Sequence, residues 1–237
     1  MTSWQILVAH VVKVLILLTL AGILTRRRAT MCWSFVAYLS AILVGNSLVS
    51  FWPHRFFDAW FWFAQQALYD ALKMAIAVEL AYRTFQAFPA AQATARRVLF
   101  GLLILTSLAL VGVPPAVSGG SPALYGAALL EWEPRVLMGT AWLMNAVAIL
   151  VVWYRVPLHA YHRAILLGFV PYLIVFTTLL RMLDRYGWDI LPFVNSAEPA
   201  AYMLLVGWWA YAAWQPEPAA DVSPAVLQKL QPWRART

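Results

Sequence analysis

Asp70 and Lys73 lie inside a long apolar stretch, at positions where a membrane helix is usually free of charge. An ionisable residue near the centre of a bilayer costs at least about 2.5–3.5 kcal/mol, so it usually faces other helices and has a partner. Because the two residues are three positions apart, they lie on one helical face and can pair directly. This spacing predicts either a structural ion pair or a polar binding site inside a membrane protein.

Other polar residues fall at similar depth in neighbouring apolar stretches, and we expect them to converge on the same place. Together they predict a ligand-binding site in the outer half of a helix bundle, formed by Lys13, Asp70, Lys73, His10, Asn46, Asn145, Arg181 and Glu198. Without Glu198 the cluster is net positive, which suits an anionic ligand or requires another acid. Glu198 is the candidate acid, but "NSAEPAAY" is also typical of a helix start, which would place Glu198 in the first turn.

Glu79 and Arg83 form a second polar feature in the same stretch. They are four residues apart, with the acid first, which is the favourable order for a pair on one helix. Glu79 is nine residues beyond Asp70, so it points to another side of the helix, about 13 Å further along. We predict a structural ion pair near the inner membrane interface.

The composition predicts an all-α membrane protein. The chain has 237 residues, of which 63% are hydrophobic and 11% charged, against a usual charged share of about 25%. Several apolar runs are long enough to cross a hydrocarbon core about 30 Å thick. We predict a seven-transmembrane-helix bundle and a short cytoplasmic tail, with spans at about 3–25, 31–52, 59–88, 94–113, 134–154, 163–184 and 195–214 and the tail at 215–237.

The distribution of basic residues predicts the orientation. Eleven lysines and arginines fall on one side of these spans and four on the other, and the basic side is normally cytoplasmic. The N-terminus is then outside and the C-terminus cytoplasmic. Basic residues follow the first apolar run, at Arg26 to Arg28, instead of preceding it. This order predicts a retained first span rather than a cleaved signal peptide, in a multi-pass protein of the cell inner (plasma) membrane.

Common cofactors lack their ligands in this pattern. A haem held between helices needs paired intramembrane histidines, yet only His10 is deep, because His54, His159 and His162 are expected in loops. A retinal Schiff base needs a lysine in the seventh span, and residues 195–214 contain none. We therefore predict no cofactor.

The sequence also gives no sign of a disulfide, a cysteine-based metal cluster, an enzyme motif or a nucleic-acid-binding surface. A single cysteine allows neither an internal disulfide nor a cysteine-based metal cluster. No HExxH, GxSxG, Walker or CxxC motif is present, so nothing indicates an enzyme. The net charge of +7 lies largely in short loops, where it reports orientation and not nucleic-acid binding.

The layout resembles the seven-helix sensor modules that precede bacterial histidine kinases, and related uncharacterised seven-helix membrane proteins. The resemblance rests on the span count, the orientation, the short loops and the third-span ending "VELAYRTFQAFP". It implies a sensor whose output passes through another membrane or cytoplasmic protein, because residues 215–237 are too short for a kinase or cyclase domain.

Three functions remain open. The first is a sensor-like or ligand-binding protein with the polar pocket described above. The second is an accessory or scaffold subunit of a larger membrane complex, in which the buried charges are structural. The third is a membrane enzyme or transporter for a lipid or small anion, although no internal repeat typical of transporters is evident. In each case the expected partners are membrane lipids and another protein.

Overall fold

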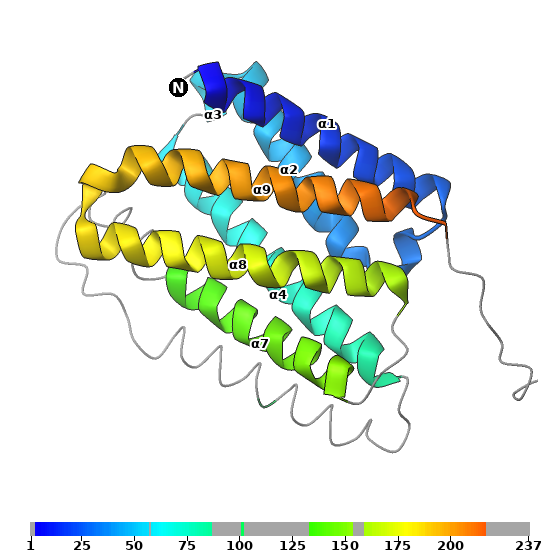
Figure 1. Cartoon of the computed structure of the whole chain (residues 1–237). Coiled ribbons are helices and arrows are strands. Elements are labelled where there is room, and N and C mark those ends of the chain that lie inside the picture. The colour runs from blue at the N-terminus through cyan, green and yellow to red at the C-terminus, as the bar shows by residue number, and fades with distance from the viewer. Residues whose placement is uncertain (1–2, 57, 87–100, 102–132, 154–158, 217–237) are drawn as a thin grey trace, which may run out of the picture.

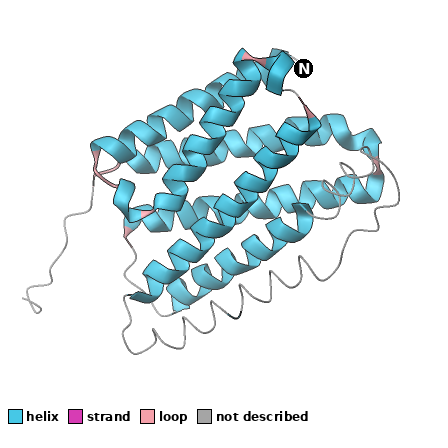
Figure 2. Cartoon of the chain, turned by 180° about the vertical axis from the view of Figure 1, so that it is seen from behind, coloured by secondary structure: helices cyan, strands magenta, loops and turns pink. Residues whose placement is uncertain are grey.

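The computed structural model describes residues 3–56, 58–86, 101, 133–153 and 159–216. Within these ranges every regular element is helical (Figure 2). The elements are α1 (Ser3–Thr25), η1 (Ala29–Met31), α2 (Trp33–Phe51), α3 (Pro53–Phe56), α4 (Ala59–Gln86), α7 (Glu133–Trp153), α8 (Ala160–Tyr186), η3 (Trp188–Ile190) and α9 (Leu191–Trp214).

Four segments are long and apolar enough to cross a membrane: Trp4–Thr25, Trp33–Phe51, Ala160–Tyr186 and Trp188–Trp214. The chain is thus a multi-pass helical membrane protein. α4 and α7 have 28 and 21 residues, which at about 1.5 Å per residue is also enough length to cross a bilayer. The predicted span at 94–113 and most of the predicted tail lie outside the described residues.

The six long helices that the structure describes form a closed ring of contacts, and Figure 1 shows them side by side. α1 packs on α2, α2 on α4, α4 on α7, α7 on α8 and α8 on α9, and α9 returns to pack extensively on α1. Each helix therefore has an inner face toward the other helices and an outer face. The buried residues of the core lie on the inner faces.

One end of the bundle, here called the arginine end, is defined by three contacts between helix termini. Arg28 donates to the Gln215 carbonyl after α9, at 2.8 Å. His162 in the first turn of α8 donates to the Met31 carbonyl, and Arg83 near the end of α4 donates to the Thr30 carbonyl. The N-terminus, α3 and η3 lie at the opposite end (Figure 1).

α4 and α7 are neighbours that run in the same direction. α4 ends at the arginine end, because Arg83 contacts Thr30 there. α8 begins at that end and runs away from it, and Arg181 near its far end contacts Met138, early in α7. α7 therefore begins at the N-terminal end of the bundle and runs toward the arginine end, as α4 does.

Aromatic side chains fill the centre of the ring. Phe35 of α2 packs edge-on against Trp209 of α9, with ring centroids 4.8 Å apart, and against Phe169 of α8 at 6.4 Å. Phe169 and Trp209 are themselves 4.6 Å apart. Such pairs bury large apolar areas in preferred ring geometries, so they join α2, α8 and α9 at one level of the bundle.

Two helices begin earlier than predicted. α9 begins at Leu191, with Pro192 in its first turn, where the fixed φ of proline and its missing N–H are tolerated. α8 begins at Ala160, where the side chain of His159 accepts a hydrogen bond from the Tyr161 N–H. Asn195 is therefore not a helix start, and Pro199 lies inside the helix.

Candidate functional site

The Asp70–Lys73 pair lies near the middle of α4, on its inner face. Lys73 Nζ is 2.9 Å from the Asp70 carboxylate. Asp70 and Lys73 are 8% and 4% exposed, so the pair is held away from both water and lipid. Lys73 Nζ also lies 5.8 Å from the ring centroid of Phe176 in α8, a cation–π distance. The pair thus faces across the bundle toward α8.

Glu198, which is half-buried on α9, is the second acidic group near this pair. It accepts a hydrogen bond from the Tyr172 hydroxyl of α8, at 2.8 Å. Because α9 begins seven residues earlier, Glu198 lies in the third turn of the helix. The alternative that Asn195 or Ser196 begins the helix and Glu198 lies in its first turn is therefore wrong. Its carboxylate bridges α9 to α8 instead of satisfying the N–H groups of its own first turn.

Tyrosines connect Glu198 to the Asp70–Lys73 pair. Tyr38 of α2 is 1% exposed and lies within electrostatic reach of Lys73, Asp70 and Glu198. Glu198 also lies within electrostatic reach of Lys73. These four residues therefore share one interior region, to which α2, α4 and α9 each contribute.

The remaining members of this region are aromatic. Tyr202 of α9 lies one turn from Glu198, and its ring centroid is 5.4 Å from that of Tyr172. Tyr172 stacks on Phe176 at 5.9 Å. We call the set the interior polar site: Tyr38, Asp70, Lys73, Tyr172, Phe176, Glu198 and Tyr202. Sequence reasoning missed its three tyrosines, although each lies well inside an apolar run and not at an end, where interfacial tyrosines are usual.

Three of the predicted ligand residues lie outside the interior polar site. His10 is exposed on α1 and donates to the Ile6 carbonyl of its own helix. Lys13 is partly exposed and donates to Ser50 Oγ, at 2.5 Å, near the far end of α2. Arg181 is exposed and turns toward Met138 Sδ of α7. The structure does not gather these cations around Asp70, so the net positive cluster expected from the sequence does not form.

The two asparagines of the predicted ligand site make hydrogen bonds within their own helices. Asn145 donates to the Ala141 carbonyl one turn earlier in α7. The carbonyl of Asn46 accepts from Ser50 Oγ, the same hydroxyl that Lys13 contacts. Neither contact reaches the interior polar site.

Glu79 lies at the arginine end and does more than pair with Arg83. The pair itself is present, at 2.7 Å. The same carboxylate accepts hydrogen bonds from the backbone N–H groups of Trp33 and Ser34, at 3.2 and 2.9 Å, and from the Ser34 hydroxyl at 2.5 Å. These N–H groups open α2 and have no partner within that helix. Glu79 therefore caps α2 from α4, and its charge complements the positive end of the helix dipole.

Cys32 lies beside this carboxylate, just before α2. Its Sγ is 3.5 Å from Glu79. Burial, reinforced by the negative charge of Glu79, raises the pKa of the Cys32 thiol to about 12. The thiol thus stays protonated at neutral pH and is a poor nucleophile. In the part of the chain that the structure describes, no group of three or more metal-binding side chains occurs.

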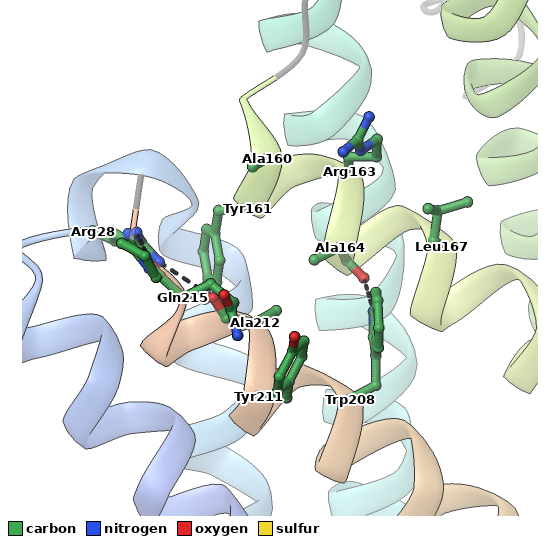
Figure 3. Close-up of a pocket in the computed structure, with 11 residues that line it drawn as sticks. Arg28, Ala160, Tyr161, Arg163, Ala164, Leu167, Trp208, Tyr211, Ala212 and Gln215 are labelled. Carbon is green, nitrogen blue, oxygen red and sulfur yellow. Dashed lines mark hydrogen bonds between the residues drawn. The ribbon is translucent and has the colours of Figure 1, made fainter. Parts of the chain in front are cut away.

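A hollow of about 310 Å³ opens between the start of α8 and the end of α9, at the arginine end (Figure 3). Arg28 forms one wall, with its guanidinium 5.8 Å from the Tyr161 ring centroid. Trp208 forms another and donates from Nε1 to the Ala164 carbonyl, at 2.9 Å. Arg163 and Tyr211 also line the hollow. It is separate from the interior polar site, none of whose residues line it.

Comparisons of the chain with protein-family models, with curated proteins and with solved structures gave no match.

Proposed function

We propose that the chain is a sensor-like or ligand-binding membrane protein whose interior polar site holds a small polar ligand. The observation that carries the proposal is Glu198. In the described part of the chain this carboxylate has no lysine or arginine within ion-pair distance, and its hydrogen-bond donor is the Tyr172 hydroxyl. A carboxylate at membrane depth that forms no ion pair is costly, which is the usual mark of a functional group.

The charges of the site favour a ligand different from the one expected from the sequence. The site contains one cation, Lys73, and two carboxylates, Asp70 and Glu198. Lys73 is 2.9 Å from Asp70, which leaves the Glu198 carboxylate as the excess acid. A ligand bearing an amine or other hydrogen-bond donors would complement it, whereas an anion offers it no donor. The aromatic rings of Tyr172, Phe176 and Tyr202 offer flat apolar walls for such a molecule.

The seven-span topology and the outer N-terminus belong to the same proposal. The parallel directions of α4 and α7 support a further crossing between them, which the predicted span at 94–113 would supply. Charge supports the orientation: five described arginines lie at the arginine end, and the four at the opposite end are accompanied by three aspartates. The basic side is normally cytoplasmic, so we place the arginine end on the cytoplasmic side of the inner (plasma) membrane.

A matched pair of variants tests the proposal. The full chain is extracted from its membrane in copolymer nanodiscs, and its bound small molecules are identified by mass spectrometry. We expect Glu198→Gln to lose a molecule that the wild type retains, while Arg185→Gln, an exposed change at the end of α8, keeps it. Equal small-molecule content in all three proteins, with equal thermal stability, would refute a ligand role for Glu198.

The second candidate is an accessory or scaffold subunit, and the closeness of the Asp70–Lys73 pair favours it. Both partners are satisfied by each other inside the bundle, as structural ion pairs are. If this alternative holds, extracting the chain from its membrane under mild conditions should recover one stoichiometric complex with another membrane protein. Replacing both Asp70 and Lys73 by Leu and Met would then leave that complex assembled.

A further inference from the structure

The hollow at the arginine end has the features of a lipid head-group site. Its eleven lining residues include two arginines, Arg28 and Arg163, and no Asp or Glu (Figure 3). Arg28 is 3% exposed and is fixed by hydrogen bonds to the carbonyls of Ala213 and Gln215. Arg163 is exposed at the rim. The hollow therefore presents the fixed guanidinium of Arg28 and the exposed guanidinium of Arg163 to whatever enters it.

Apolar side chains lead away from the hollow along the outer faces of both helices. On α8, Leu167 and Ile174 are 54% and 50% exposed and lie four and eleven residues after Arg163, so they continue its face. On α9, Leu204 and Trp208 are 72% and 43% exposed and precede Tyr211 on one face. The surface is thus polar and basic at the helix ends and apolar toward the membrane centre.

This polarity matches an amphiphile with a negative head. Tyrosine and tryptophan beside a basic cluster are typical of the level at which lipid head groups lie, and each basic residue near that surface attracts anionic lipid. We propose that the hollow binds the head group of an anionic phospholipid, with Arg163 and Arg28 facing its phosphate and Leu167 and Trp208 contacting its acyl chain. This site is independent of the interior polar site and does not depend on its ligand.

Lipid binding to the full chain tests the assignment. The purified protein in detergent is titrated with phosphatidylglycerol or with phosphatidylcholine of the same acyl chains, and bound lipid is followed by native mass spectrometry. We expect phosphatidylglycerol to bind at least about fivefold more tightly, and Arg163→Gln to remove about fivefold of that affinity, the effect of one basic residue beside an anionic surface. Arg163 is exposed, so this variant is expected to fold.

Two controls make the result decisive. Arg185→Gln, at the other end of the same helix, is expected to bind phosphatidylglycerol as the wild type does. Inorganic phosphate alone is expected not to displace the lipid. Equal binding of both lipids, equal losses in the two arginine variants, or full displacement by phosphate would each overturn the assignment, the last by showing a site for the free anion.

Discussion

At the scale of single residues, the interior polar site places charges where each depends on the others. Lys73 is held between the Asp70 carboxylate and the Phe176 ring, while Glu198 depends on the Tyr172 hydroxyl. Removing one partner of a buried ion pair leaves the other without compensation, whereas replacing both by apolar groups avoids that cost. Comparing single with double variants therefore shows whether Asp70 and Lys73 act as a structural ion pair or whether one of them is needed to bind a ligand.

Lys73→Met is expected to lower the free energy of unfolding by about 3 kcal/mol or more, because Asp70 stays buried without its cation. The double variant Asp70→Leu, Lys73→Met should regain most of that loss. Thermal or denaturant unfolding in detergent measures both. A double variant no more stable than the single one would mean that the two side chains do not stabilise each other.

At this scale the sequence predicted the Asp70–Lys73 pair but not the residues that surround it. The depth and spacing of Asp70 and Lys73 indicated a pair on one face, as the structure has it. The position of Glu198 was misjudged, because Asn195, Ser196 and Pro199 are typical of a helix start and hid the true start at Leu191. Tyr172 and Tyr202 carried no recognisable spacing. Contacts between helices depend on the rotation and tilt of each helix, which hydropathy does not specify.

At the scale of elements, Glu79 and Arg28 connect helix ends that are far apart in the chain. Glu79 of α4 caps the start of α2, and Arg28 after α1 donates to carbonyls at the end of α9. Glu79 places a negative charge at a helix N-terminus and Arg28 places a positive charge at a helix C-terminus, and both are favourable with the helix dipole. The sequence indicated the Glu79–Arg83 spacing but not the cap, because nothing in α4 identifies which helix start it will meet.

Glu79→Ala is expected to lower the free energy of unfolding by about 1–2 kcal/mol, since the Trp33 and Ser34 N–H groups lose their acceptor. Tyr82→Ala is a suitable control, because Tyr82 lies in the same turn and is 52% exposed. Thermal unfolding in detergent compares the two. Equal losses would contradict the capping role.

Gly168 allows α8 and α9 to approach closely. A Cβ added there would lie 2.7 Å from Trp209 Nε1 and 2.8 Å from Leu205 Cδ1. Gly168→Ala is therefore expected to destabilise the protein by about 1–3 kcal/mol through overpacking. Gly207→Ala, whose nearest neighbour is Leu15 Cδ1 at 4.0 Å, should be neutral or stabilising. If the two variants unfold at the same temperature, the close approach at Gly168 is not needed.

At the scale of the whole molecule, the ring of helices and its uneven charge define the architecture. Hydropathy was sufficient to place the six long helices that the structure describes to within a few residues. It did not show that α9 closes the ring on α1, nor that α4 and α7 are parallel neighbours, because both properties arise from packing between distant segments. The unequal net charge of the two ends leads to a testable orientation.

Cysteine labelling in intact cells tests that orientation. In a Cys32→Ser background, Asp189→Cys is expected to react with a membrane-impermeant maleimide. Thr30→Cys, at the arginine end, should react only after permeabilisation. Both positions are exposed, so accessibility is decided by the side of the membrane. The reverse pattern would place the arginine end outside.

The central claim is that the interior polar site holds a ligand, and a structure determined directly from native membranes tests it most directly. The measurement is the density beside Glu198, Tyr172 and Lys73 in the intact chain. We predict a non-protein feature within hydrogen-bonding distance of the Glu198 carboxylate, lying against the Tyr172 and Tyr202 rings. A region filled entirely by protein side chains, with Glu198 satisfied by them alone, would contradict the claim and favour the scaffold function.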